Sequence, residues 1–206
     1  MFPKVLNTVT NKNEPLEFKR LRKDLWAANE GTIDFLNLIF EATLSGNKVL
    51  AKVVHRSYGK DVHAHLAARE MAPRLYGTSS IQDCVILIVM GLLDDVWTTL
   101  FDYRENIHRS GTPKPHRSKL LKRLEEILGY LSAGGMVHGD FRMANVMLKQ
   151  GEEEKAMLID FDWAGEAGKV RYPVTCSDGF LYPGRPGGPI DAKHDREFYE
   201  KWKGEI

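Results

Sequence analysis

The sequence has little that would mark a secreted or membrane-spanning protein. Its 206 residues include only two cysteines, Cys84 and Cys176, which are too few for a disulfide scaffold. No apolar run approaches the roughly 20 residues that a helix needs to cross a bilayer. The start, MFPKVLNTVTNKN, lacks the long apolar core of a signal peptide. These absences predict an intracellular, reduced setting, and we expect a cytoplasmic protein with no membrane partner.

An excess of charge of one sign is also missing, because 29 lysine and arginine residues stand against 28 aspartate and glutamate residues. A strongly basic balance is typical of chains that bind nucleic acid, and a net charge of +1 gives no such indication. We therefore expect no nucleic-acid partner. The length suffices for one ordinary domain or two small lobes, and the composition leaves the oligomeric state open.

The residues that indicate a function are concentrated in the segment 137–162, which reads VHGDFRMANVMLKQGEEEKAMLIDFD. Two short apolar runs, Asn145–Lys149 and Ala156–Ile159, flank a polar segment that contains Gly151. This pattern predicts a β-hairpin with a solvated turn.

Three oxygen-bearing side chains stand at the ends of this hairpin. Asp140 precedes the first strand, Asn145 begins it, and Asp160 ends the second. Because antiparallel strands joined by a turn bring their outer ends together, we expect these side chains to converge. Two carboxylates and an amide oxygen suit Mg²⁺ with phosphates completing the shell, and a carboxylate can orient an attacking hydroxyl. The alternative is a buried polar hairpin in some other α/β domain.

The same stretch resembles a known family. HGD at 138–140, followed by Asn145, resembles the HxDxxxxN catalytic loop of the protein-kinase-like superfamily, and IDFD at 159–162 resembles its DFG metal motif. The glycine of HGD is more similar to aminoglycoside phosphotransferases and other small atypical kinases. The strings HGDFRMANV, LIDFDWAG and VRYP together are similar to a group of fungal kinase-like proteins. The resemblance covers most of the chain and is strong over 48–54 and 136–173.

The resemblance implies an α+β, two-lobed, protein-kinase-like fold with a minimal C-terminal lobe. We expect a loose polar tail over residues 1–15, a β-rich N-terminal lobe over 16–90, and a mainly helical C-terminal lobe over 91–206 that carries the catalytic hairpin. Within the first lobe, the secondary structure of Glu17–Ala28 is left undecided between two alternatives. Its apolar spacing fits a helix, whereas the resemblance would make part of it the first strand.

Hydrophobic patterns and turn residues predict further elements around the hairpin. They are the strands Phe35–Leu44, Lys48–Val54 and Val85–Met90 and the helices Asp61–Glu70, Asp94–Tyr103, Arg117–Ala133 and Asp191–Trp202. The clearest is Arg117–Ala133, where leucines repeat on one face and charges fill the other. On the Asp94–Tyr103 helix we expect Trp97 and Phe101 to share a face. Residues 177–189 are dense in Gly and Pro and predict an extended loop.

The resemblance implies roles for residues of the catalytic loop. Asp140 would orient or deprotonate the acceptor hydroxyl, and His138 would support the loop structurally. Asn145 and Asp160 would hold Mg²⁺. Arg142 would neutralise the transferring phosphate or, alternatively, only face solvent.

Two segments after the hairpin bear on the same site. Arg171-Tyr172-Pro173 is interpreted as a turn, and the alternative is that it places a positive group near the acceptor. In the last helix, His194-Asp195 would anchor the catalytic loop from below.

On the nucleotide side, Lys52 in LAKVV resembles the lysine of the VAIK motif and would neutralise the α- and β-phosphates of ATP; otherwise it is a solvated strand lysine. The resemblance implies that a glutamate of the next helix pairs with Lys52, and Glu70 is the only glutamate there. Pro73 ends the helix soon afterwards, so the alternative is that Glu70 is an exposed last-turn residue. Asp61 or His63 lies nearer the position of the pairing residue. Gly31 is the only glycine in the loop before the hairpin, where a GxGxxG motif is lacking. Met90 and Leu92 would run beside the adenine.

The leading hypothesis is therefore an ATP- and Mg²⁺-dependent phosphotransferase that acts on a hydroxyl of a protein or a small molecule. One alternative is a pseudokinase that serves as a binding module, which the missing glycine-rich loop and the short C-terminal part favour. Another is a small-molecule kinase, which the HGD form of the loop favours.

Overall fold

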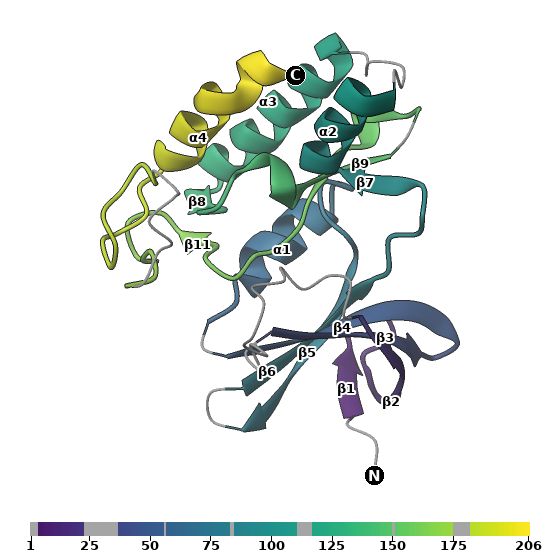
Figure 1. Ribbon diagram of the computed structural model, residues 1–206. Coiled ribbons are helices and arrows are strands. Elements are labelled where there is room, and N and C mark those ends of the chain that lie inside the picture. The colour runs from purple at the N-terminus through teal and green to yellow at the C-terminus, as the bar shows by residue number, and fades with distance from the viewer. Residues whose placement is uncertain are drawn as a thin grey trace, which may run out of the picture. The chain divides into compact units, whose positions relative to one another are not determined.

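The computed structural model describes residues 4–22, 37–55, 57–82, 85–110, 117–149, 151–174 and 182–206 (Figure 1). The strands are β1 Lys4–Asn7, β2 Lys12–Leu21, β3 Asn37–Leu44, β4 Asn47–His55, β5 Leu75–Gln82, β6 Val85–Gly91, β7 Trp97–Thr99, β8 Met136–Val137, β9 Val146–Lys149, β10 Met157–Leu158 and β11 Gly165–Glu166. The helices are α1 Lys60–Ala67, α2 Leu100–Ser110, α3 Arg117–Ala133 and α4 His194–Trp202. The mixed α+β class is as predicted. No helix in the described ranges is long and apolar enough to cross a membrane.

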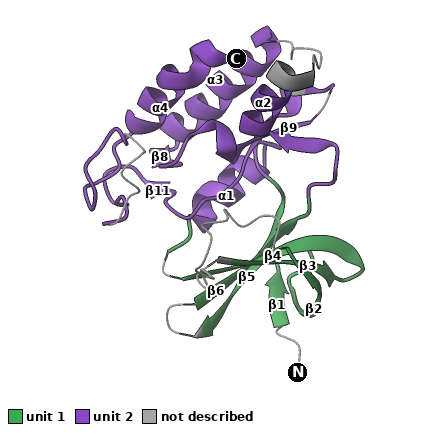
Figure 2. Cartoon of the chain, in the orientation of Figure 1, with its two compact units in different colours: residues 1–58, 73–92 green, residues 59–72, 93–206 purple. Residues whose placement is uncertain are grey.

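The chain separates into two compact units, coloured in Figure 2. Residues 1–58 and 73–92 form unit 1, and residues 59–72 and 93–206 form unit 2. The sequence places the boundary near residue 90 and keeps the helix after β4 with the strands. The contacts instead place that helix, α1, in unit 2.

Unit 1 is an antiparallel sheet with the strand order β1-β2-β3-β4-β6-β5. Its core is a cluster of buried aliphatic side chains from five of these strands: Val5, Leu16, Ala42, Leu44, Val49, Ala51, Leu87 and Val89. The predicted β3–β4 hairpin is confirmed, with Leu44 paired to Asn47 across Ser45 and Gly46. Both turn residues have positive φ, 51° and 78°, as a tight two-residue hairpin turn requires.

The expectation of a loose tail over residues 1–15 is wrong. Lys4–Asn7 forms β1, and β2 already begins at Lys12, with Val5 paired to Glu14. The polar composition misleads because Val5 supplies an apolar side chain that is fully buried in the unit 1 core. The open segment Glu17–Ala28 is strand up to Leu21, and its part from residue 23 lies outside the described residues.

The first strand also reaches β5, at the opposite end of the strand order. The Thr8 N–H donates to the Tyr76 carbonyl at 2.7 Å, and the Thr8 hydroxyl donates to the Leu75 carbonyl at 3.0 Å. Gly77 permits this approach, because a Cβ there would collide with the Leu6 carbonyl oxygen. The sheet of unit 1 therefore curls until its two outer strands meet.

Gly77→Ala is expected to lower the free energy of unfolding by roughly 1–3 kcal/mol, because the added methyl overlaps β1 backbone that cannot rotate away. Gly129→Ala is the matched control. It adds the same methyl inside α3 with no atom within 4 Å, and should stabilise by about 0.5–1 kcal/mol. Urea unfolding of both variants provides the measurement. A Gly77→Ala midpoint at or above that of the wild type would contradict the packing of β1 on β5.

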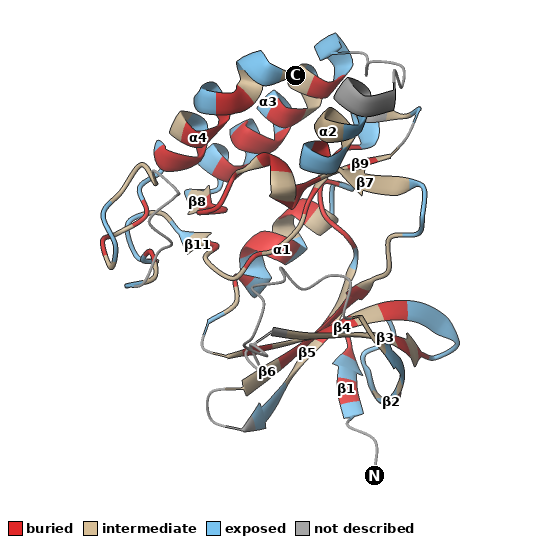
Figure 3. Ribbon diagram, in the orientation of Figure 1, coloured by how far each residue is buried: buried red, intermediate tan, exposed pale blue. Residues whose placement is uncertain are grey.

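Unit 2 is organised around α3, whose bounds are those predicted for Arg117–Ala133. Its buried face, red in Figure 3, consists of Leu120, Leu124, Ile127, Leu128 and Leu131. The hairpin predicted between Asn145 and Ile159 is also confirmed, whereas its catalytic role stays a prediction. Strands β9 and β10 pair antiparallel, with Met147 opposite Met157, and β7 adds a third strand.

The predicted helix Asp94–Tyr103 needs a correction. Trp97–Thr99 is the strand β7, paired to β9, and α2 begins only at Leu100. The Thr99 hydroxyl accepts a hydrogen bond of 3.0 Å from the Asp102 N–H, which fixes the start of the helix. Phe101 is 44% exposed. Pairing with a strand 50 residues away in the sequence leaves no local signal.

Helix α1 is shorter than the predicted Asp61–Glu70, because Glu70 lies beyond its end at φ +53°. Its ends are tied to the segment around the DFG-like motif. The Gly59 N–H donates to the Phe161 carbonyl at 2.9 Å, and the Leu158 N–H donates to the Met71 carbonyl at 2.8 Å. These bonds explain why residues 59–72 belong to unit 2.

Candidate active site

The loop of residues 138–145, which the sequence predicts to be the catalytic loop, is anchored by the last helix, as expected. The Asp195 carboxylate accepts hydrogen bonds from the His138 N–H at 2.6 Å and from the Gly139 N–H at 2.8 Å. Asp195 is almost fully buried, and burial raises its pKa to about 6 although these two bonds lower it. The backbone before Asp140 is thereby fixed to α4.

A second anchor from α4 was missed by the sequence analysis. The Trp202 indole N–H donates to the Phe141 carbonyl at 2.9 Å, and the two rings stack with centroids 6.1 Å apart. Tyr199 meets the Phe141 ring edge-on. The available signal was the spacing of Asp195, Tyr199 and Trp202, which places all three on one helix face. Asp140 is therefore held through the residues on both of its sides.

Gly139 is required by its backbone conformation and by its neighbours. Its φ is +83°, and a Cβ would lie 2.9 Å from Ile190 Cδ1 and 3.0 Å from the Trp163 carbonyl oxygen. A side chain at this position would push the loop away from the segment that contains Ile190.

His138 is fully buried, and its contacts fit the structural role predicted for it. Its Nε2 lies 2.9 Å from the Ile159 carbonyl oxygen, and its Nδ1 accepts from the Asp140 N–H at 3.3 Å. This pair of contacts fits a neutral imidazole with the proton on Nε2. Burial lowers the pKa of His138 to about 4, so the ring is neutral at physiological pH.

Asp140 combines burial with one unused oxygen atom. Its Oδ2 accepts from Asn145 Nδ2 at 2.9 Å and pairs with Arg142 Nη2 at 2.9 Å. Its Oδ1 is buried and has no hydrogen-bond partner among the described residues. Burial raises the pKa of Asp140 to about 6, although the Arg142 guanidinium lowers it. A carboxylate with this pKa can take up a proton near neutral pH.

The three side chains expected to converge are brought together within unit 2. Asn145 Nδ2 also donates to the Asp140 carbonyl at 3.0 Å, and the Ile159 N–H donates to the Asn145 carbonyl at 3.0 Å. Asp160 follows at φ +66°, a conformation that aspartate tolerates better than most residues. Its charge raises the pKa of both Asp140 and His138, as expected for a near neighbour.

The carboxylates of Asp140 and Asp160 and the amide oxygen of Asn145 are hard oxygen donors, a type of ligand that fits Mg²⁺. Within the described ranges, no three His, Cys, Asp or Glu side chains gather into a metal cluster. Mg²⁺ does not need one, because it takes one or two protein oxygens and completes its shell with water and phosphate. The bonds of Asn145 Nδ2 to Asp140 leave its Oδ1 as the atom for a cation. The metal role of Asn145 and Asp160 stays a prediction.

The residues expected on the nucleotide side are distributed over both units. Lys52 is buried in β4, 7% exposed, and Met90 is buried in β6, with Leu92 just after that strand. Glu70, in unit 2, is exposed in the turn after α1, where its carbonyl accepts from Arg123. Gly31 lies outside the described residues. The roles of these residues stay predictions.

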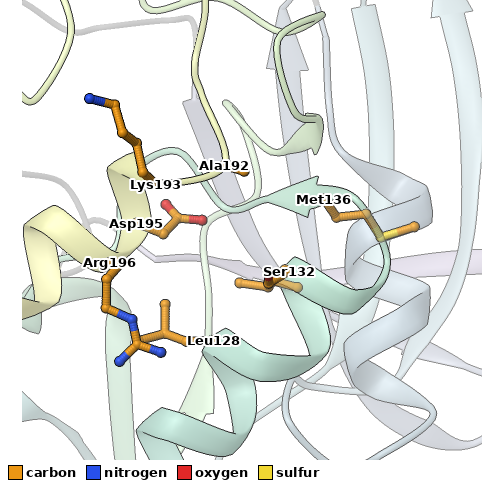
Figure 4. A pocket seen from close by; sticks show the side chains of 8 residues that line it. Leu128, Ser132, Met136, Ala192, Lys193, Asp195 and Arg196 are labelled. Atoms are coloured by element: carbon orange, nitrogen blue, oxygen red, sulfur yellow. The ribbon is translucent and has the colours of Figure 1, made fainter.

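Unit 2 also has a surface cavity of about 350 Å³ between α3 and α4 (Figure 4). It is lined by Leu128, Leu131, Ser132, Met136, Lys193 and Arg196, with Asp195 in its wall. Both cations are already paired, Lys193 with Glu197 and Arg196 with Glu125. Because the Asp195 carboxylate is engaged by the catalytic loop, the cavity offers no free acid or base for catalysis.

Comparison with known proteins supports the fold alone. Neither a protein-family model nor a curated protein sequence matches the chain. Among solved structures, the kinase PK-1 of Cydia pomonella granulovirus is similar, with a TM-score of 0.55 and 13% sequence identity. The match covers 79% of this chain and 58% of the viral kinase, so the chain spans less than two thirds of that protein's length. The fold is therefore kinase-like, as the sequence resemblance implies.

Proposed function

We propose that the protein is a phosphotransferase that moves the γ-phosphate of ATP, bound with Mg²⁺, to a hydroxyl group. The observation that carries this proposal is the state of Asp140. It is buried, its Oδ1 is unused, its pKa is raised to about 6, and the loop around it is anchored at His138, Gly139 and Phe141. A fixed carboxylate of this kind suits the orientation and deprotonation of an acceptor hydroxyl.

Each residue of the proposed site has a separate task. Asp140 Oδ1 accepts the proton of the acceptor hydroxyl, while Asn145 holds Oδ2 in place. Asn145 and Asp160 would hold Mg²⁺, which would neutralise charge on the phosphates. Arg142, 31% exposed beside Asp140, neutralises charge on the transferring group. Lys52 contributes a cation for the α- and β-phosphates, on the strength of its sequence motif.

A binding module without catalysis is the second candidate, and the position of Glu70 favours it. That side chain is exposed past the end of α1, so the acid expected to pair with the strand lysine is not held inside the helix. The two candidates differ in phosphate transfer and agree on nucleotide binding.

ATP binding is expected to depend on a divalent metal. Asp160→Asn is expected to weaken the affinity for ATP with Mg²⁺ about tenfold or more, because loss of a metal ligand or of its support typically lowers metal affinity 10–100-fold. Titration calorimetry of the full chain with ATP, in Mg²⁺ and in EDTA, measures both effects. Asp94→Asn makes the same change at an exposed aspartate of unit 2 and should leave affinity unchanged. Equal ATP affinity in Mg²⁺ and EDTA would show that the metal assignment is wrong.

A further inference from the structure

One surface of unit 2 is not used by the proposed chemistry. Residues 171–173 and 187–189 lie side by side, with Arg171 bridged to Pro189 (Figure 1). The Tyr172 N–H donates to the Gly188 carbonyl at 3.0 Å, and the Gly187 N–H donates to the Pro173 carbonyl at 3.1 Å. These bonds hold the two segments side by side. We refer to Arg171, Val174, Arg185, Gly187 and Gly188 as the basic turn.

Three side chains of the basic turn gather over its two glycines. Arg171 Nη1 donates to the Gly187 carbonyl at 3.1 Å. The Arg185 side chain lies across Gly188, where a Cβ would be 2.8 Å from Arg185 Cγ. Val174 lies 3.8 Å from the corresponding position at Gly187 and is 81% exposed. Two guanidinium groups and an exposed apolar side chain therefore share one small area.

The two arginines have no acidic partner in the part of the chain that the structure describes. Of the acids near them in the sequence, Glu166 pairs with Lys169, Asp191 lies beside His194, and Asp178 lies outside the described residues. Both arginines are exposed. Neighbouring like charges repel each other, so an anionic group that binds between them removes an unfavourable interaction as well as adding a favourable one.

The basic turn is joined directly to the catalytic loop. The Ile190 N–H donates to the Val170 carbonyl at 2.9 Å, and the Ile190 side chain packs at the position where Gly139 lacks a Cβ. Tyr172, next to Arg171, contacts His194 of α4 through its hydroxyl at 3.2 Å. A molecule bound at the basic turn is thus held by the same framework that positions Asp140.

We propose that the basic turn binds an acidic peptide segment of the phosphate acceptor, with carboxylates opposite Arg171 and Arg185 and a small apolar side chain against Val174. Small ligands bind mainly in enclosed cavities, whereas exposed arginines beside an apolar side chain are typical of protein interfaces. This inference rests on the proposed function in naming an acceptor, but peptide binding requires no catalysis.

The test measures binding of short fluorescein-labelled peptides to the full chain by anisotropy, without ATP. A peptide in which Ser is flanked by Glu and Val is compared with versions that carry Gln or Lys in place of Glu. Arg171→Gln and Arg185→Gln should each weaken binding of the acidic peptide about two- to fivefold, the usual range for exposed charge pairs. Arg185→Lys should retain most of the binding, and Lys122→Gln, an equal charge change on α3, should have no effect.

The outcomes separate this inference from the proposed function. Equal affinity for the Glu and Lys peptides, or unchanged binding by the double Arg→Gln variant, would overturn the inference. So would competition by inorganic phosphate as effective as that by the acidic peptide, because the surface would then be a small-anion site. If the acidic peptide binds through both arginines but receives no phosphate from ATP, the peptide site stands and the phosphotransferase proposal fails.

Discussion

Asp140→Ala is expected to reduce phosphate transfer about 10²–10⁴-fold, the usual contribution of a positioned general base. Binding of ATP with Mg²⁺ should stay nearly unchanged, because Asp140 is assigned to the acceptor hydroxyl. The fold should survive, since burial raises the pKa of Asp140 and its ionised form is costly to keep in the protein. Lys52→Ala is the complementary variant and should weaken ATP binding. Calorimetry measures affinity, and radiolabelled ATP measures transfer.

The pH dependence gives the same prediction an independent readout. Asp140 must be ionised to accept a proton, and its pKa is raised to about 6. Transfer by the wild type should therefore fall as the pH is lowered through about 6, and residual transfer by Asp140→Ala should lack this step. If the wild type binds ATP but transfers phosphate to no protein, small molecule or water, and Asp140→Ala changes nothing, the protein is a binding module.

Leu124→Ala is expected to reduce the free energy of unfolding by roughly 2–5 kcal/mol, the usual cost of truncating a buried leucine. Leu124 is fully buried at the centre of the apolar face of α3. The neighbouring Glu125→Ala is the control. It removes an exposed ion pair with Arg196 and a side-chain hydrogen bond with Tyr199, which together should contribute about 1 kcal/mol, less than the cost of Leu124→Ala. Similar shifts in the urea midpoint for both variants would show that the assigned helix face is wrong.

The elements predicted well from the sequence are those set by local pattern. The bounds of α3 follow from its leucine repeat. The β3–β4 turn was predicted from its turn residues, of which Ser45 and Gly46 adopt the positive φ that such a turn requires. Elements that depend on distant partners were missed or displaced. Nothing near Lys4–Asn7 reveals its contact with β5, and nothing near Trp97 reveals its pairing with β9.

The candidate site shows the same division. The approach of Asn145 to the residues before Asp160 follows from hairpin geometry, and the anchor at Asp195 was predicted from the sequence. The contact of Trp202 with Phe141 depends on how α4 packs, and the Arg142–Asp140 pair depends on side-chain conformation. Spacing in the sequence places Trp202 on the same helix face as Asp195 but identifies neither contact partner. The placement of α1 in unit 2 was missed for a similar reason, because its hydrogen-bond partners come about 90 residues later.

That placement of α1 determines an order of events during biosynthesis. Residues 59–72 are translated well before Leu158 and Phe161, whose backbone groups bond to them in the finished protein. At a synthesis rate of roughly 5–20 residues per second, these partners are synthesised on the order of ten seconds after the helix. During that time Val62 and Leu66, both buried in the folded protein, lie in a segment whose two end bonds have not yet formed. The nascent chain therefore presents a short amphipathic segment that chaperones can bind until the catalytic hairpin emerges.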